Sequence, residues 1–180
     1  MKDTTKGVLF GLGAYSMWGG FPLFFALFDA VPAFEVLIHR IIWSCVFLAV
    51  IISLLRRWSS VRAAFRAPKR LGWVFGCAVL IALNWGVYIY AVESRQVLQA
   101  SLGYFLTPLV NVALGMLFLK ERLQRWQSVA VLLAAMGILL QLVWLGTLPL
   151  LTLVLAGSFG AYGLLRTQVP LDGLTGLFGE

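Results

Sequence analysis

Charged side chains are scarce in this sequence. Only 12% of the 180 residues are charged, against roughly 25% in a typical soluble domain, and only seven are acidic. Hydrophobic types make up 61%. The elements of a soluble fold would alternate apolar with polar residues, whereas here apolar runs continue for whole spans. The sequence therefore predicts an all-α integral membrane protein, a polytopic helix bundle.

Residues that carry catalysis or bind metals are also few. The chain has one histidine and two cysteines, Cys45 and Cys77, which lie in apolar runs where a free cysteine behaves as a small hydrophobe. One histidine with Glu35 and Glu93 near one surface is too little for a membrane enzyme. We expect no enzyme activity, no metal and no cofactor. The net charge of +7 does not indicate nucleic-acid binding, because the charges form short blocks between apolar runs.

The chain has long uncharged runs instead. A membrane helix needs about 20 mostly apolar residues to cross the hydrocarbon core. The sequence contains six transmembrane spans by this measure, at 7–28, 33–55, 71–92, 96–119, 126–145 and 150–165. The last two belong to one uncharged stretch that would be about 60 Å long as a single helix. Gly146, Thr147 and Pro149 supply the turn that divides it.

The basic residues are distributed unevenly among the predicted loops. All 14 lysines and arginines except Arg40 and Arg95 fall on one side of the membrane. Short cytoplasmic loops retain positive charge, so the N-terminus is predicted to be cytoplasmic. The longest loop, 56–70, has three apolar residues at helical spacing, Trp58, Val61 and Phe65. They indicate an amphipathic segment on anionic lipid, and an ordinary solvated linker fits almost as well.

A short repeat links the first and sixth spans. Gly13-Ala14-Tyr15 corresponds to Gly160-Ala161-Tyr162. With five spans per repeat a second copy begins from the opposite side of the membrane, as in many secondary transporters, so we expect about ten helices in a 5+5 inverted repeat. Residues 1–145 would be the first five-helix repeat, and 146–180 the sixth helix with the beginning of the next loop. We expect the chain to be a C-terminally truncated form of such a protein.

Polar side chains inside the spans are functional candidates, because they are costly in hydrocarbon. In the fourth span, one arc of the helix contains Tyr104, Thr107, Pro108 and Asn111. Pro108 leaves a backbone carbonyl unpaired, which is tolerated where it lines a cavity. Further candidates lie in the first span, Tyr15, Trp18 and Pro22, and in the third, Asn84, Trp85 and Tyr88. For Asn84 and Asn111, hydrogen bonds that only hold the helices together are an equal alternative.

The second span carries a Glu-His-Arg group. Glu35 and His39 lie four residues apart on one face, with Arg40 adjacent. Because His39 can change charge near neutral pH, the group indicates a proton relay or an anion-binding site. A cluster at the outer interface that snorkels to water is the favoured alternative. We count His39 among the cavity candidates and assign Glu35, Arg40, Pro22 and Pro108 to coupling or gating.

Several motifs resemble a known family. They are His39-Arg40-x-x-Trp43-Ser44, Asn84-Trp85 with Tyr88-Ile89, Ala100-Ser101-Leu102-Gly103-Tyr104-Phe105-x-x-Pro108-Leu109-Val110-Asn111, Leu114-Gly115 and Glu121-Arg122. Over its whole length the chain resembles the RarD group of EamA-type transporters, RarD-like chloramphenicol-sensitive proteins of the drug/metabolite transporter superfamily. The resemblance implies a two-repeat protein of the bacterial inner membrane with a central cavity. Where the family usually has Glu this chain has Gln99, so the resemblance implies that one titrating carboxylate is missing.

Together these patterns predict a multi-pass secondary transporter of a small metabolite or drug-like solute, with the first, third and fourth spans around its cavity. Its partners would be the solute and the lipid bilayer. A truncated chain would not function alone. The alternative is a half-transporter that works as a homodimer, and its weakness is the charge bias, which fixes one orientation. A membrane enzyme is a weaker alternative.

Overall fold

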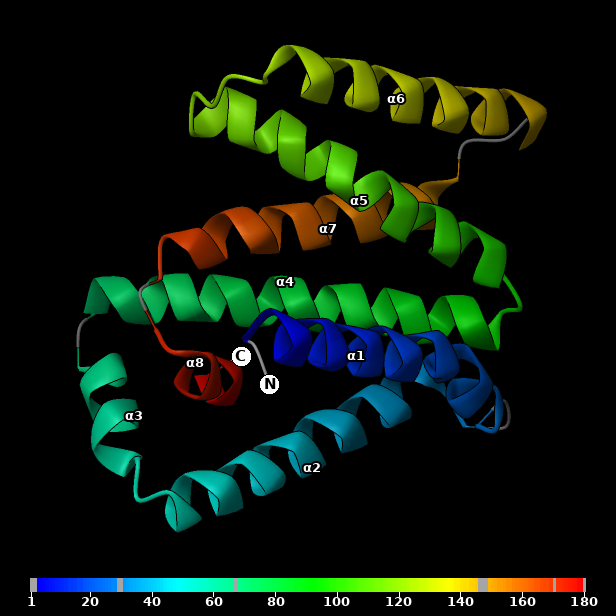
Figure 1. Ribbon diagram of the computed structural model, residues 1–180. Coiled ribbons are helices and arrows are strands. Elements are labelled where there is room, and N and C mark those ends of the chain that lie inside the picture. Colours follow the sequence, from blue (N-terminus) through cyan, green and yellow to red (C-terminus); the bar gives the residue numbers. More distant parts are fainter. Residues whose placement is uncertain (1–2, 29–30, 67, 146–148, 170, 180) are drawn as a thin grey trace.

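The computed structural model describes residues 3–28, 31–66, 68–145, 149–169 and 171–179. Within these residues the chain is helical, as the composition predicts (Figure 1). The helices are α1 (Asp3–Ala26), α2 (Ala33–Leu54), α3 (Trp58–Phe65), α4 (Pro68–Glu93), α5 (Val97–Phe118), α6 (Arg125–Leu145), α7 (Leu150–Thr167) and α8 (Gly173–Gly179). Long apolar runs become helices because lipid offers no partners for backbone polar groups, and a helix satisfies these groups within itself.

Five helices are long and apolar enough to cross a membrane: α1, α2, α4, α5 and α7. They correspond to five of the six predicted spans. The remaining predicted span forms α6. Its apolar segment, Arg125–Gln141, is shorter than the other five. Of the predicted turn before α7, Pro149 directly precedes the helix, while Gly146 and Thr147 lie outside the described residues.

Three of the long helices end in the same way. The second residue after each helix has a left-handed backbone and is basic: Arg56 (φ 52°) after α2, Arg95 (φ 58°) after α4 and Lys120 (φ 56°) after α5. The next amide N–H then reaches back to the last turn, as from Arg57 to the carbonyl of Ile52 at 2.9 Å. This closure satisfies carbonyls that a helix end leaves unpaired.

The centre of the bundle consists of α4, α5 and α7, and α7 packs against both of the others (Figure 1). Small residues allow the close approach of α5 and α7. A Cβ atom on Gly103 would lie 2.8 Å from the Cβ of Leu155, and one on Gly160 would lie 2.5 Å from Cγ1 of Val110. Gly160 of the sequence repeat is therefore a packing residue in this fold.

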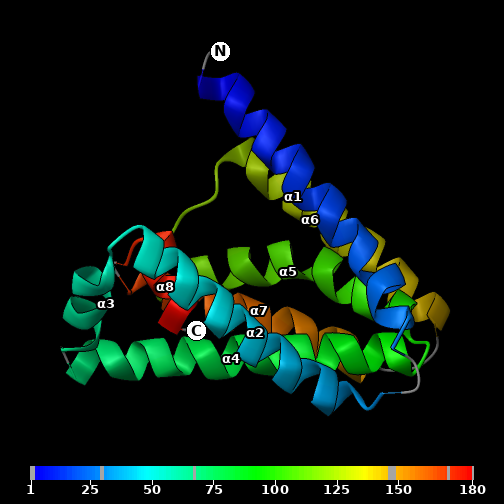
Figure 2. The ribbon, with the colours of Figure 1, turned by 90° about the horizontal axis from the view of Figure 1, so that it is seen from below.

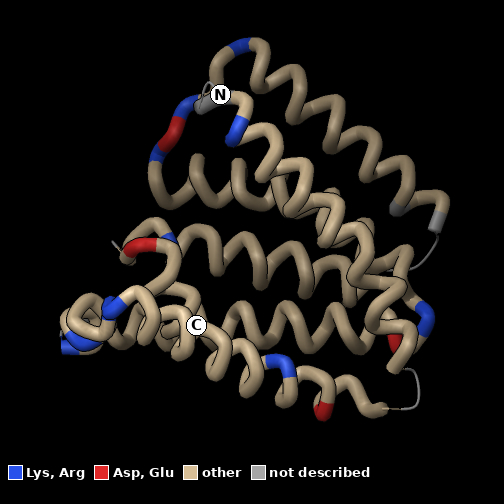
Figure 3. The backbone as a smooth tube through the Cα atoms, turned by 60° about the horizontal axis from the view of Figure 1, so that its bottom comes forward, with Lys and Arg blue, Asp and Glu red and all other residues tan. Residues whose placement is uncertain are grey.

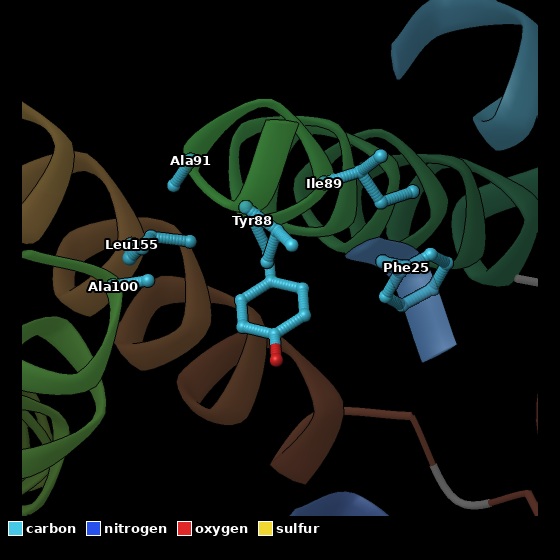
Figure 4. Packing of buried hydrophobic residues seen from close by; sticks show 7 residues of the cluster. Phe25, Tyr88, Ile89, Ala91, Ala100 and Leu155 are labelled. Atoms are coloured by element: carbon cyan, nitrogen blue, oxygen red, sulfur yellow. The ribbon is translucent and has the colours of Figure 1, made fainter. Parts of the chain in front are cut away.

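The buried core lies where α1, α2, α4, α5 and α7 meet. Figure 4 shows Tyr88 of α4 between Phe25 of α1 and the pair Ala100 and Leu155 of α5 and α7. By contrast, α1 and α6 carry many exposed apolar side chains and slope away from the central helices (Figure 2). In a membrane such faces meet lipid or other transmembrane helices.

Charged residues gather at the helix ends. Figure 3 shows basic residues concentrated at the end of the bundle that holds α3 and the connection from α5 to α6. The basic loop contains a helix, α3, as the amphipathic pattern indicates, but this helix also packs against protein. Val61 is buried, and the ring of Trp58 lies 5.6 Å from that of Phe178 in α8. Inside the long helices, Arg40 of α2 is the charged residue that lies farthest from a helix end.

Candidate functional site

Aromatic side chains from four helices meet inside the bundle. The rings of Tyr88 (α4) and Tyr104 (α5) are 5.7 Å apart between centroids. Trp18 (α1) and Phe159 (α7) each lie 6.3 Å from Tyr104, and Trp85 lies 5.7 Å from Tyr88. Their tilted and edge-to-face contacts are the favoured arrangements of aromatic pairs. We call these five residues the aromatic cluster.

Four of the five residues of the aromatic cluster are among the cavity residues predicted from the sequence. The structure brings together Trp18, Trp85, Tyr88 and Tyr104, which the sequence places on three separate spans. The predicted Tyr15 reaches the cluster only through Trp18, at 6.1 Å, and its side chain is 72% exposed.

Phe159 is absent from the prediction, although its sequence context holds a signal. The repeat aligns Tyr162 with the candidate Tyr15, and Phe159 stands three residues before Tyr162 on the same face of the helix. The rings of Phe159 and Tyr162 lie 5.8 Å apart, so this pair extends the cluster along α7.

The aromatic cluster lies near the middle of the spans. At a rise of 1.5 Å per residue, Trp18, Trp85 and Tyr104 are each about 4–5 Å from the midpoint of their helix. All three are displaced toward the same end of the bundle, where α4 connects to α5 (Figure 1). The cluster is therefore at membrane depth and away from the basic loops.

Arg40 of α2 lies against the cluster. Its guanidinium carbon is 3.3 Å from the centroid of the Trp85 ring, a cation–π stack. The other members of the predicted group, Glu35 and His39, are exposed. Of the predicted group, Arg40 is therefore the member that contacts the cluster.

The start of α2 is held by a residue absent from the predicted site. The backbone N–H of Ala33 donates a 3.0 Å hydrogen bond to the carboxylate of Glu93 at the end of α4. A carboxylate at a helix N-terminus satisfies an unpaired donor and suits the helix dipole. This contact fixes α2 beside α4, where Arg40 can reach Trp85.

Asn84 forms a polar link between helices and is fully buried. Its side-chain amide donates to the Leu155 carbonyl at 2.9 Å and to the Ser158 hydroxyl at 3.0 Å, both in α7. Its oxygen accepts a longer, 3.4 Å bond from the Tyr104 hydroxyl. Asn84 therefore holds the bundle together and adjoins the cluster through Tyr104. A direct contact between Asn84 and a solute stays a prediction.

The remaining candidates on α5 are divided among different surroundings. Thr107 is buried, and its hydroxyl donates to the Gly103 carbonyl at 2.9 Å. The side-chain oxygen of Asn111 faces α7, where a Cβ atom on Gly160 would lie 3.4 Å from it. Pro108 is exposed, and α5 continues as a helix through it.

Pro22 of α1 is partly buried, and its helix likewise continues through the proline. The coupling or gating role assigned to Pro22 and Pro108 stays a prediction.

A groove of about 340 Å³ lies outside the aromatic cluster, between α2 and α4. Its lining is apolar and consists of Leu37, Ala82, Leu83, Gly86, Val87 and Tyr90. Because it offers few polar groups to orient a solute, it suits a lipid chain better than a transported metabolite. Among the described residues no group of three or more His, Cys, Asp or Glu is placed to hold a metal ion.

Comparison with known proteins identifies relatives over the whole chain. The model of the EamA-like transporter family matches residues 5–143. The chain is 47% identical to an "Uncharacterized transporter" of Vibrio cholerae and 46% identical to "Protein RarD" of Escherichia coli. It is 31% identical to "Chloramphenicol-sensitive protein RarD" of Pseudomonas aeruginosa.

These matches cover nearly all of this chain but less of the relatives. They include 99% of the chain in the first two cases and 100% in the third, against 59%, 60% and 62% of the relatives' own lengths. The chain therefore spans about 60% of the length of the curated relatives that it matches. No solved structure matches it.

Proposed function

Because the chain belongs to the EamA-like transporter family, we propose that its helices form part of a secondary transporter that moves a small metabolite or drug-like solute across the bacterial inner membrane. The relatives that are named transporters support a transport role over an enzymatic one. The observation that carries the proposal is the aromatic cluster, which gathers side chains from α1, α4, α5 and α7 near mid-membrane.

The cluster has the chemistry that a solute site requires. Binding sites for small molecules are mostly apolar and contain a few polar groups that fix orientation. Here the aromatic faces supply apolar area, while the hydroxyls of Tyr88 and Tyr104 and the guanidinium of Arg40 supply the polar groups. Secondary transporters of many folds place their sites near the bilayer midplane.

We propose that further helices complete the wall of this pathway. The side chain of Trp18 is 40% exposed and that of Tyr15 72% exposed, so one side of the cluster is open in this chain. The curated relatives are longer, and in them additional helices are available for this role. A second copy of this chain is the alternative source. Copies that carry Tyr15→Cys, with Cys45→Ser to remove an exposed thiol, should form a disulfide-linked dimer in membranes if a second copy closes the cluster.

The charge distribution supports an orientation with the N-terminus in the cytoplasm. The connections from α2 to α4 and from α5 to α6 carry most of the basic residues, and short cytoplasmic loops retain such residues. We propose that the end of the bundle near the α4–α5 connection, toward which the cluster is displaced, faces the periplasm.

Transport assays with aromatic probes test the proposal. Membrane vesicles that contain a chimera, in which this chain replaces the corresponding part of a longer relative, should take up radiolabelled chloramphenicol, phenylalanine or phenylacetate faster than vesicles without it, for at least one of the three. Trp18→Ala and Tyr104→Ala should lower that rate to the background, because each removes a ring from the cluster. Trp126→Ala is the matched control, since that side chain is 85% exposed on α6. Uptake that survives both cluster substitutions would refute this pathway.

A further inference from the structure

We propose that Arg40, stacked on Trp85, binds the anionic group of the solute, so that the transported molecule is a small organic anion with an aromatic or other planar apolar body. This inference rests on the proposed function and names the class of substrate. The observation behind it is the position of Arg40, at membrane depth, on one ring of the aromatic cluster.

The stack leaves the hydrogen-bonding edge of the guanidinium unused. An arginine that lies flat on a ring uses its π face, while its five N–H donors point outward in its own plane. Within the described part of the chain, the side chain of Arg40 makes no hydrogen bond and no salt bridge, and the ion pair found there joins Arg57 and Asp172. The donors of Arg40 are therefore available to a bound group.

The charge of Arg40 needs a counterion. An arginine inside a span is expensive in hydrocarbon and normally pairs with an acidic group or faces water. The chain has few acids, and the nearest in sequence, Glu35, is exposed near the start of α2. A carboxylate or phosphate on the solute would neutralise the charge and accept a bidentate pair of hydrogen bonds.

The groups around Arg40 favour an anion over a cation. Beyond its stacking partner Trp85 lie Tyr88 and Tyr104, neutral groups that carry no charge to pair with the guanidinium. On its own helix, Glu35 and His39 are exposed. A cationic solute would meet the unneutralised positive charge of Arg40 and be repelled.

The aromatic cluster supplies the place for the apolar body. From Trp85 the rings continue to Tyr88 at 5.7 Å and then to Tyr104 at 5.7 Å. A planar solute with its anionic group on Arg40 could stack along these rings. Phenylacetate has this combination of a ring and a carboxylate.

Binding of three matched probes tests the inference. The full chain is placed in nanodiscs of uncharged phosphatidylcholine, and dissociation constants are measured from tryptophan fluorescence for phenylacetate, phenylacetamide and phenethylamine. We expect phenylacetate to bind about tenfold more tightly than the neutral amide, about the gain of one charge-assisted hydrogen bond. The cationic amine should bind least.

Substitutions test whether Arg40 causes this preference for the anionic probe. Arg40→Gln should reduce the advantage of phenylacetate over phenylacetamide to about twofold or less, because most of one charge-assisted hydrogen bond is lost. Arg40→Lys keeps the positive charge and should retain part of this advantage. Arg95→Gln removes the same charge from the exposed α4–α5 connection and should leave the advantage intact. Size-exclusion profiles show which variants fail to fold. If Arg40→Gln is one of them, the preference of Arg40→Lys for phenylacetate is compared with that of Arg95→Gln instead.

The outcomes separate this inference from the proposed function. If no probe of any charge binds, this inference is overturned, and the uptake assay decides the proposed function. If phenylacetamide binds as tightly as phenylacetate, or the amine binds most tightly, the aromatic site stands and the anion-binding role of Arg40 is overturned. If discs of anionic phosphatidylglycerol abolish phenylacetate binding while phosphatidylcholine discs support it, a lipid headgroup competes for Arg40, and the solute assignment is overturned in native membranes.

Discussion

The side-chain amide of Asn84 donates a 3.0 Å hydrogen bond to the hydroxyl of Ser158, and this bond joins α4 to α7 at a fully buried position. The same amide also reaches the backbone of Leu155, so one residue fixes the register between two central helices. A buried amide in lipid is costly unless it is paired, and here α7 supplies both acceptors.

Asn84→Ala should therefore destabilise the bundle. Interhelical hydrogen bonds in membranes average about 0.6 kcal/mol, and the substitution removes two short ones to α7 and the longer one from Tyr104, so we expect a loss of about 1–2 kcal/mol in the free energy of unfolding. Ser158→Ala should cost about half of this. Denaturation in mixed micelles gives the values, with Ser101→Ala as the control because that hydroxyl bonds within its own helix. Equal losses for Asn84→Ala and Ser101→Ala would contradict the link to α7.

Gly103→Ala should separate α5 from α7. The added methyl group would lie 2.8 Å from the Cβ atom of Leu155, and the backbone has to move to admit it. We expect a loss of about 1–3 kcal/mol in unfolding free energy, the usual cost of overpacking. Gly137→Ala on α6 is the matched control, since nothing lies within 4 Å of its added methyl group. It should be neutral or slightly stabilising, and a comparable loss at both positions would argue against close packing at Gly103.

The contact of Asp172 with its neighbours should give a weak pH dependence at acid pH. Hydrogen bonds from Thr175 lower the pKa of this exposed carboxyl, and the nearby Arg57 lowers it further. A carboxyl with a lowered native pKa stabilises the fold above its unfolded pKa, near 4, and this stabilisation is lost as the pH falls through the native pKa. Asp172→Asn should therefore lower Tm slightly at pH 6.

Below the native pKa of Asp172 the difference in Tm between Asp172→Asn and the unchanged protein should disappear, because the aspartic acid is then protonated too. Thermal melts from pH 6 to pH 3 check this. Arg57→Gln should keep most of the pH dependence, since Thr175 is the larger influence on the pKa of Asp172. A Tm difference that is constant with pH would contradict the assigned cause.

Thiol labelling in spheroplasts tests the predicted orientation. In a background without Cys45 and Cys77, Arg95→Cys should react with a membrane-impermeant maleimide, and Lys6→Cys should react only after the membrane is opened. The reason is that Arg95 lies on the α4–α5 connection, opposite the basic loops. The reverse labelling pattern would show that the N-terminus is outside.

The helix bounds follow closely from the sequence. The predicted span 33–55 corresponds to α2, which ends at Leu54, because an uninterrupted apolar run between polar residues defines a membrane helix by itself. The first and third spans are the exceptions. The helix α1 begins at Asp3, four residues before the predicted span, and α4 begins at Pro68, three residues before its apolar run, since proline is well tolerated in the first turn of a helix.

The contacts between helices are less predictable. Around a span that meets lipid on several sides, apolar residues cover every face, so hydrophobic periodicity does not reveal which face meets protein. Only the polar and aromatic residues indicate which face of each helix points into the bundle. From them Trp18, Trp85, Tyr88 and Tyr104 are predicted to line one cavity, and the structure brings these side chains together. The stacking of Arg40 on Trp85 could not be predicted, because it depends on the packing of two helices far apart in the sequence.

The central position of α7 has a consequence for the order of assembly. During synthesis α4 and α5 enter the membrane first, and the acceptors for the amide of Asn84 are made only when the ribosome reaches α7. Until then that amide must be satisfied by water or by the insertion machinery. The interior of the bundle thus closes late, and the growing chain remains a loose set of helices until α7 inserts.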